Sequence, residues 1–475
     1  MPHVYNNRRA AALAALLGLL GLGAVGALAA HLGLTETAKY GFVFMGALAV
    51  GAGAYLIWHT EPHYTFTFAV LLAPFAGNWQ QLGVSGELAP ERLILLAGLA
   101  TVLLRGPGIR NRPPLRLEGV HWLLALVAVY AVISALFAGT LFEKAPGIEL
   151  IETFGIFPFL VFTVAPVVFP TARERATLVV GLVGLATYLS LTTIFEITGP
   201  SSLVFPSYIS DPSYGIHFGY GRGPFVEAVS NGFGLYVGAL ACFIAVKIWH
   251  GPWARRYAAV VGVLCLVGSL LTFERSVWIS TVVASLVLLL TARSTRRIVI
   301  PALVAGAVLV AVALVLIPGL SSKVSTRAGD RQTVWDRQNL DNTALNMINA
   351  HPLFGFGWSR YLAESGPYVQ LSPNIPLTAS NKDVHSIVLT YAVELGLVGV
   401  TLWIIAVLLG VAGALLTRAP PDLEPWRATL LALFVFFAIQ ENFVPPAVFQ
   451  NLCLWLWVGV VWAARYPQRK RCPHE

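Results

Sequence analysis

The sequence predicts an all-α membrane protein that crosses the bilayer many times. Of its 475 residues, 57% are hydrophobic and only 11% are charged. The apolar residues form blocks of roughly 18 to 25, the length of a helix that crosses a bilayer. One long polar stretch interrupts these blocks and predicts a large loop domain outside the membrane. These observations indicate about 12–14 transmembrane helices, in which some of the shorter blocks form half-helices or surface elements.

The predicted spans are bounded by charged residues and turn formers. In chain order they are Ala11–Ala30, Phe42–Trp58, Phe66–Val84, Leu93–Leu104, Val120–Phe137, Leu150–Phe169, Ala176–Phe195, Ala228–Trp249, Tyr257–Thr272, Val277–Leu290, Ile298–Ile317, Ser386–Leu416, Leu430–Ile439 and Val448–Trp462. The first block follows Arg8 and Arg9, and no small-residue cleavage site follows it. We therefore expect a retained first helix rather than a cleaved signal peptide.

The polar stretches divide the chain into four parts. Residues 1–226 hold the N-terminal spans and the first long outer loop, residues 227–317 the central spans, residues 318–384 the large extracytoplasmic loop, and residues 385–475 the C-terminal spans with a basic tail. In the large loop, Leu340, Ala344, Met347 and Ile348 recur at i, i+4, i+7 and i+8. This spacing predicts an amphipathic helix that begins at Arg331 and ends at His351–Pro352.

The arginine- and lysine-rich connections all fall on one side of the membrane if every predicted span is real. Such residues are retained in the cytoplasm, so both termini are expected there. The same asymmetry explains the net charge of +8, and a nucleic-acid partner is not indicated. Three of the four cysteines fall within predicted spans, so neither a disulfide framework nor a thiolate metal site is expected.

Four basic side chains are predicted at the opposite, outer side: Arg222, Arg275, Arg331 and His385. The planar guanidinium group matches a phosphate, so converging arginines favour a lipid diphosphate at this depth. For each arginine the alternative is headgroup anchoring or a salt bridge. Glu274 favours that alternative, because it could neutralise the neighbouring Arg275.

His385 is the predicted general base, because a neutral imidazole can accept the proton of a hydroxyl nucleophile. Its place at a helix start and near arginines would help to keep it neutral. Asp383 could orient the imidazole or act as an alternative base, and His217 is a weaker rival. The alternative is an interfacial histidine that bonds to water.

One helix further on, Ser386, Thr390 and Glu394 form a polar stripe at i, i+4 and i+8. An ionisable group inside a membrane is a functional candidate, although Glu394 could instead bond to a neighbouring helix. No metal-ligand spacing stands out, so neither a metal nor another cofactor is expected.

Four stretches in order, "GRGPFVEAVSNGFGLYV", "LTFERSVWIS", "RQTVW…NMINAHPLFGFG" and "VHSIVLTYAVELGLVG", resemble the bacterial O-antigen ligase and polymerase superfamily. The likeness covers about residues 220–400. It implies a GT-C-like fold in the bacterial cytoplasmic membrane and a glycosyltransferase whose active site faces the extracytoplasmic side. The implied donor is a glycan on undecaprenyl diphosphate, and the implied acceptor is a lipid A core sugar or another lipid-linked glycan.

By this resemblance Arg222 and Arg275 hold the donor diphosphate and His385 is the base, with no metal or nucleotide sugar. Two positions depart from the family pattern. Glu274 stands where a small or hydroxyl residue is frequent, and Ser386 where asparagine is common.

Two other classes of protein remain open from the sequence. A lipid-linked oligosaccharide flippase or secondary transporter would suit the number of spans, but transporters usually place their coupling residues near the midplane and often show internal repeats. A scaffold for envelope assembly would need neither His385 nor Arg275 for its function.

Overall fold

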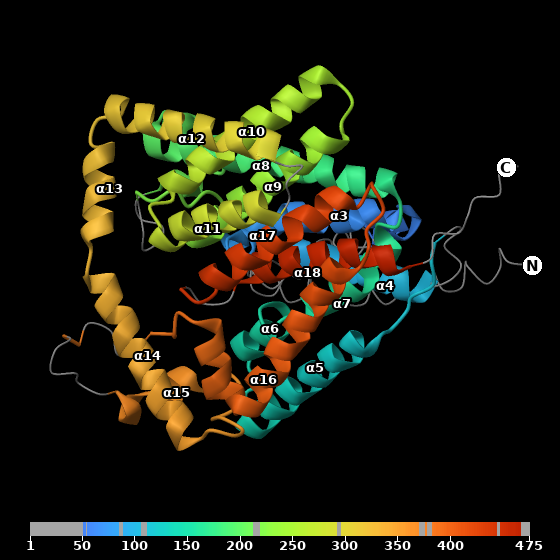
Figure 1. Ribbon diagram of the computed structural model, residues 1–475. Coiled ribbons are helices and arrows are strands. Elements are labelled where there is room, and N and C mark those ends of the chain that lie inside the picture. Colours follow the sequence, from blue (N-terminus) through green and yellow to red (C-terminus); the bar gives the residue numbers. More distant parts are fainter. Residues whose placement is uncertain are drawn as a thin grey trace, which may run out of the picture.

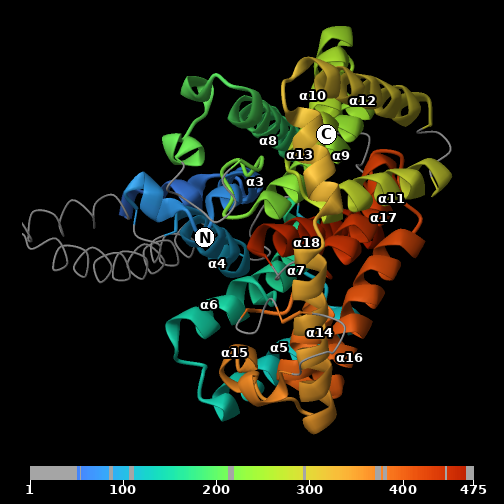
Figure 2. The same cartoon turned by 90° about the vertical axis from the view of Figure 1, so that its left-hand side faces the viewer.

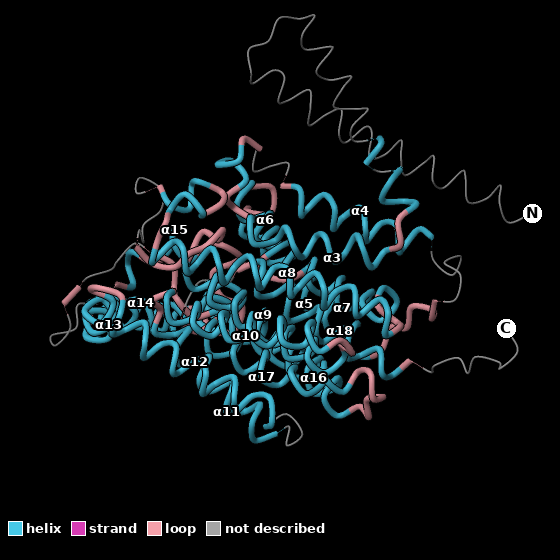
Figure 3. Tube along the Cα trace, turned by 90° about the horizontal axis from the view of Figure 1, so that it is seen from above, coloured by secondary structure: helices cyan, strands magenta, loops and turns pink. Residues whose placement is uncertain are grey.

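A computed structural model describes residues 51–53, 55–84, 89–105, 112–211, 219–291, 296–369, 376–377, 382–443 and 447–466. Across these ranges the protein is built of helices and short turns, without a strand (Figures 1 and 3). Eight helical segments among them are long and apolar enough to cross a membrane. The all-α polytopic class is therefore confirmed.

The helices agree with most of the predicted blocks. They are α3 (Pro62–Leu72), α4 (Pro90–Arg105), α5 (Gly119–Ala138), α6 (Lys144–Glu152), α7 (Ile156–Val168), α8 (Ala172–Thr198), α9 (Ala228–Ile248), α10 (Pro252–Leu271), α11 (Arg275–Thr291), α12 (Arg296–Leu316), α13 (Leu320–Gly329), α14 (Gln332–Ala350), α15 (Tyr361–Glu364), α16 (Ile387–Leu416), α17 (Glu424–Gln440) and α18 (Val448–Trp462). The predicted spans Ala11–Ala30 and most of Phe42–Trp58 lie outside the described residues.

The predicted span Phe66–Val84 is wrong in its second half. The helix α3 ends at Leu72, and two short 3-10 turns follow it, Ala73–Phe75 and Trp79–Leu82. Pro74 supplies no amide donor, and Gly77 and Gly83 take positive φ angles of 84° and 76°, so the helix cannot continue. The segment is a half-helix.

The helix α8 joins two ends of the bundle. Its 27 residues extend about 40 Å, enough to cross a membrane. At its start Arg112 forms ion pairs with Glu61 and Glu174, and nearby Arg175 pairs with Asp422. We call this the ion-paired end; Arg112 and Arg175 belong to two of the arginine-rich connections that the sequence assigned to one side.

At the other end of α8, Glu196 accepts hydrogen bonds from the backbone amides of Arg222 and Gly223. We call this the loop end. Figure 1 shows α13 and α14 along the left edge of the bundle, and Figure 2, which faces that side, shows them in line across it. The amphipathic helix predicted in the large loop is confirmed as α14, with Leu340, Ala344 and Met347 buried.

The longest helix, α16, is interrupted at Gly396, which has φ 69° and ψ 177°. The loop after α14 fills the break: Phe356 and Gly357 donate amide hydrogen bonds to the carbonyls of Val393 and Glu394, both at 2.9 Å. In return Leu397 donates to the carbonyl of Pro352 at 2.8 Å. The backbone groups released by the break are thus satisfied within the protein, as a membrane segment requires.

This junction, which we call the loop–helix clasp, leaves no room for a side chain at Gly396. A Cβ atom there would lie 2.1 Å from the carbonyl oxygen of Leu353. The substitution Gly396→Ala should therefore lower the free energy of unfolding by about 1–3 kcal/mol or more, because the backbone region is also open only to glycine. The measurement is the apparent melting temperature of the purified protein.

The matched control is Gly184→Ala, within α8, where no heavy atom lies within 4 Å of the new Cβ. It should leave the melting temperature unchanged or raise it slightly, since alanine favours helix. Equal melting temperatures for both variants would contradict the clasp.

Candidate active site

The junction between α10 and α11 carries the first group of charged side chains. Phe273 takes a positive φ of 54°, which turns the chain sharply before Glu274. The Glu274 carboxylate pairs at 3.1 Å with Arg327 of α13. Arg327 also donates to the carbonyl oxygen of Phe273 at 3.0 Å and lies over the ring of Tyr220. Glu274 is therefore neutralised by Arg327 rather than by its neighbour Arg275.

Arg275 is consequently held by neutral acceptors. Its guanidinium donates to the carbonyl oxygen of Asp330 at 3.0 Å and to the hydroxyl of Thr333. Among the described residues no carboxylate lies within ion-pair distance of it. The side chain is oriented while its positive charge remains available to an anion. Glu274 therefore does not neutralise Arg275, because its carboxylate pairs with Arg327.

Arg222 lies in the adjoining segment. Gly221 donates its amide to the carbonyl of Leu271 at 2.9 Å, which fastens this segment to the end of α10. The Arg222 guanidinium is buried and donates to the carbonyls of Tyr208 and Ile209, both at 3.4 Å. The first outer loop thus carries Arg222 to the corner that also holds Arg275.

Arg331 directly precedes α14, as predicted, but its side chain makes no capping hydrogen bond and is exposed. The arginine that enters the site from this helix is Arg337, which sequence reasoning missed. It donates to the carbonyl of Phe443 at 3.1 Å, lies over that residue's ring, and acts electrostatically on Glu274, Arg275 and His385.

A signal for Arg337 was present in the sequence. Thr333, Arg337, Leu340, Ala344 and Met347 follow the spacing i, i+4, i+7, i+11 and i+14, so Arg337 continues the buried stripe of α14 by one turn. The predicted stripe included only apolar residues, so Arg337 was left out of it. An arginine on that stripe faces the protein.

His385 stands just before the start of α16. Its main chain is fixed because Ile387 donates to the carbonyl of Glu441 at 2.8 Å and the Ser386 hydroxyl donates to Asn442. Burial lowers the pKa of His385, and the charges of Arg337 and Lys382 lower it further. The imidazole is therefore mostly neutral at pH 7, the state that a general base needs.

The Asp336 carboxylate also acts on His385, and its negative charge raises the pKa of the imidazole. The Nδ1 atom of His385 and the Oδ1 atom of Asp336 are both buried without a hydrogen-bond partner among the described residues. The predicted partner, Asp383, instead acts on Glu149 and Tyr361. Asp336 of α14 is thus the better placed group to orient the imidazole. The rival His217 lies outside the described residues.

Glu394 belongs to the clasp. Its buried carboxyl accepts hydrogen bonds from the backbone amides of Ser359 and Tyr361. It holds the segment that follows Gly357 against α16, so a supporting role fits its contacts better than proton transfer.

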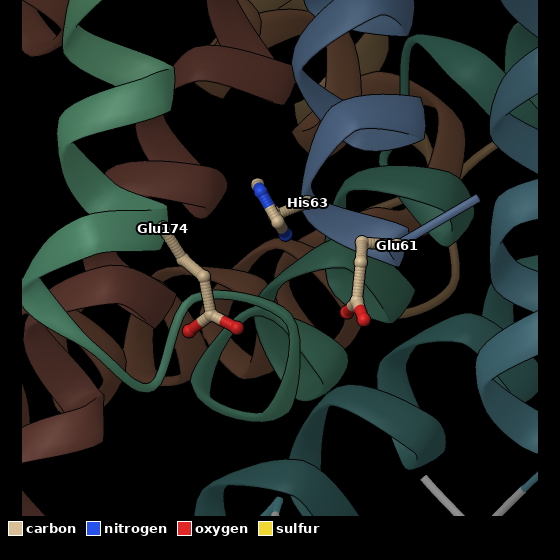
Figure 4. Close-up of side chains that lie close together, drawn as sticks. All are labelled: Glu61, His63 and Glu174. Carbon is tan, nitrogen blue, oxygen red and sulfur yellow. The ribbon is translucent and has the colours of Figure 1, made fainter. Parts of the chain in front are cut away.

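One group of metal-ligand types does occur in the described part of the chain. Ligand atoms of Glu61, His63 and Glu174 lie within 4.8 Å of one another (Figure 4). Spacing along the sequence did not reveal it, because Glu174 comes from a distant helix. Arg112 already pairs with both carboxylates, at 2.8 and 3.1 Å, and supplies the positive charge there. Glu174 and Glu196 lie at opposite ends of α8, about 33 Å apart, so this group is remote from His385.

Residues 260–404 match the family described as O-antigen ligase. The matched segment runs from α10 into α16 and contains Arg275, Arg337 and His385, whereas Arg222 precedes it. The match confirms the resemblance to the O-antigen ligase and polymerase superfamily. No curated protein matches the chain.

The charges around His385 predict opposite pKa shifts in two variants. Lys382→Gln removes a cation that lowers the pKa and also frees Asp336, with which Lys382 pairs at 3.7 Å, so the pKa of His385 should rise. Asp336→Asn removes the opposing carboxylate, so the pKa should fall. Only the neutral imidazole reacts with diethylpyrocarbonate, and the pH dependence of His385 modification, followed by mass spectrometry, measures both shifts.

The control is Lys323→Gln, an exposed lysine of α13 that does not act on His385. It should leave the modification curve in place. Shifts in the same direction for Lys382→Gln and Asp336→Asn would refute this account of the site.

Proposed function

We propose that the protein transfers a glycan from undecaprenyl diphosphate to a hydroxyl of an acceptor sugar, at the extracytoplasmic face of the bacterial cytoplasmic membrane. It is an O-antigen ligase-type or polymerase-type membrane enzyme, as the family match supports. The observation that carries the finer proposal is the loop-end corner itself. There Arg275 and Arg337 are held by neutral acceptors, and a half-buried, mostly neutral His385 stands in the field of Arg337.

In the proposed reaction His385 takes the proton of the acceptor hydroxyl as its oxygen attacks the anomeric carbon of the donor. The new bond joins that oxygen to the anomeric carbon, and the bond from the anomeric carbon to the diphosphate oxygen breaks. Undecaprenyl diphosphate leaves with the bonding electrons. Arg222, Arg275 and Arg337 stabilise the charge that develops on it, and fixed donors in a shielded site are most effective in this role.

The proposed orientation of the protein in the membrane follows from the charged residues at the two ends of the bundle. Arginine-rich connections are retained in the cytoplasm, so the ion-paired end is assigned to that side and the loop end to the outside. The acceptor is a lipid A core sugar in a ligase and the end of another lipid-linked glycan in a polymerase. The clasp and α14 would enclose that acceptor beside His385.

The transporter alternative is less well supported by these contacts. The oriented arginines gather at one end of the bundle rather than near its midplane, where transporters usually bind their substrates. A flippase also has no use for a mostly neutral histidine in the field of a carboxylate. A product glycan distinguishes the two classes of protein.

Transfer in proteoliposomes tests the proposal. With a lipid-diphosphate-linked glycan and candidate acceptors, His385→Ala should slow transfer by about 10²–10⁴, the usual contribution of a general base. Arg275→Lys should slow it by roughly tenfold or more, because a point charge does not replace a planar fork. Arg331→Lys is the control and should keep most of the activity, since Arg331 is exposed. Products resolved by gel separate a ligase from a polymerase.

A single displacement also predicts the stereochemistry of the product. The new glycosidic bond should have the anomeric configuration opposite to that of the donor linkage, because the acceptor attacks from the side away from the diphosphate. Nuclear magnetic resonance of the product reports this configuration. A retained configuration would rule out direct displacement and require a covalent intermediate.

The proposed chemistry predicts that chelation leaves transfer intact. The donor bond is already activated, and the only described group of three metal-ligand residues lies at the other end of α8. Transfer rates with and without EDTA should agree within error. A large loss restored by Mg²⁺ would contradict the proposed mechanism.

A further inference from the structure

A groove of about 550 Å³ lies between α9, α10 and α12. Its wall is almost entirely aliphatic and aromatic, with Leu240, Phe243, Val263, Leu266 and Leu309 among the lining side chains. The volume lies within the range of known small-molecule sites. None of the residues assigned to glycan transfer lines it.

The groove arises because α9 and α12 both pack against α10 but hardly touch each other. After its first two residues, Arg296 and Arg297, the helix α12 is apolar, and most of it is exposed on the protein surface. Val260 and Leu309, at the rim, are 58% and 42% exposed. In a membrane this opening faces the lipid chains, so the groove is reached from within the bilayer.

The groove occupies the half of the bundle that is remote from His385. The helix α9 begins beside Arg222 at the loop end, but its lining residues start only at Tyr236 and continue to Val246. In α12, which starts at the ion-paired end, the lining runs from Arg297 to Leu309. The groove therefore extends from the ion-paired end toward the middle of the bundle.

Among the residues that the structure describes, Arg297 is the one charged residue that lines this groove. Its side chain is exposed and has no hydrogen-bond or ion-pair partner among the described residues. Neighbouring cations at this end are engaged: Arg296 donates to the carbonyl of Leu289, and Arg255 donates to that of Trp249. Arg297 thus places an uncompensated positive charge at the mouth of an apolar groove.

We propose that this groove binds one acyl chain of an anionic phospholipid, with the lipid phosphate at Arg297. The aliphatic wall matches a hydrocarbon chain, and the guanidinium matches a phosphate oxygen pair. Basic residues at a membrane surface favour anionic over zwitterionic lipids. The lipid belongs to the leaflet at the ion-paired end, opposite the proposed site of glycan transfer.

The position of the charge favours a phospholipid over the donor's own polyprenyl tail. A donor bound at Arg222 and Arg275 has its diphosphate at the loop end, and it would leave Arg297 without an anion. A phospholipid in the other leaflet satisfies both the charge and the apolar wall. The binding of a lipid in this groove needs only a membrane around the helices, whereas the choice of a phospholipid over the donor rests on the proposed site of glycan transfer.

The test uses the full chain in phosphatidylcholine vesicles that contain phosphatidylglycerol with a photoreactive acyl chain. Peptide mass spectrometry should find labelling concentrated on α9, α10 and the first half of α12. Arg297→Ala should lower this labelling about fivefold, the effect of one basic residue on anionic lipid. Arg256→Ala is the matched control, because Arg256 stacks on Trp253 at the same end and does not line the groove.

Ala302→Phe provides a second variant, which fills the groove without a change in charge and should also lower the labelling. Excess unlabelled phosphatidylglycerol should compete with the probe. Two outcomes would overturn the proposal. One is even labelling of all exposed helices that is insensitive to Arg297→Ala, and the other is competition by undecaprenyl phosphate that equals that of phosphatidylglycerol.

Discussion

The arrangement of the loop end depends on the ion pair between Glu274 and Arg327. Both side chains are nearly buried, with 9% and 12% of their surfaces exposed, and a buried charge without its partner is strongly unfavourable. Glu274 belongs to the α10–α11 junction and Arg327 to α13, so the pair fastens the large loop to the bundle. Asp330, which follows α13, bonds to both Arg327 and Arg275 and so sets the start of α14. The positions of Asp336 and Arg337 follow from that start.

The large loop is fastened a second time at the clasp. There the chain after α14 supplies hydrogen bonds to the broken backbone of α16, and Glu394 accepts two more from the same segment. His385 lies between the two attachments, just before α16. Arg337, whose charge acts on it, belongs to α14, and Arg275 belongs to α11. The proposed base and the proposed anion-binding groups therefore belong to separate elements, and both attachments are needed to bring them together.

Two sets of arginines in the bundle are held by different partners. At the ion-paired end Arg112, Arg175 and Arg465 each have a carboxylate partner, which indicates a structural role. At the loop end Arg275 and Arg337 are positioned by carbonyl or hydroxyl oxygens, so their charges are oriented but not neutralised. This difference separates arginines that hold the fold from those suited to an anion. Arg297, at the ion-paired end, belongs to neither set, because it has no hydrogen-bond or ion-pair partner among the described residues.

Composition and the periodicity of hydrophobic residues predicted much of the fold. Long apolar blocks predict spanning helices because only a helix satisfies its own backbone in lipid, and the spacing of Leu340, Ala344 and Met347 predicted α14. The break at Gly396 was not readable, because its hydrogen bonds come from residues about forty positions earlier in the chain. The turn after Leu72 was misread because hydropathy outweighed Pro74 and Gly77.

The sequence by itself determined which residue types stand at the loop-end junctions, since Arg222, Arg275 and His385 could be named from span ends and motifs. Only the tertiary structure decided how their charges are paired. Glu274 is adjacent to Arg275 in the chain but pairs with Arg327, and Asp383 is two residues from His385 but acts on other groups. Ion pairs form between side chains that packing brings together in space. Neighbours in sequence at a helix start point in different directions, so proximity along the chain does not predict the partner.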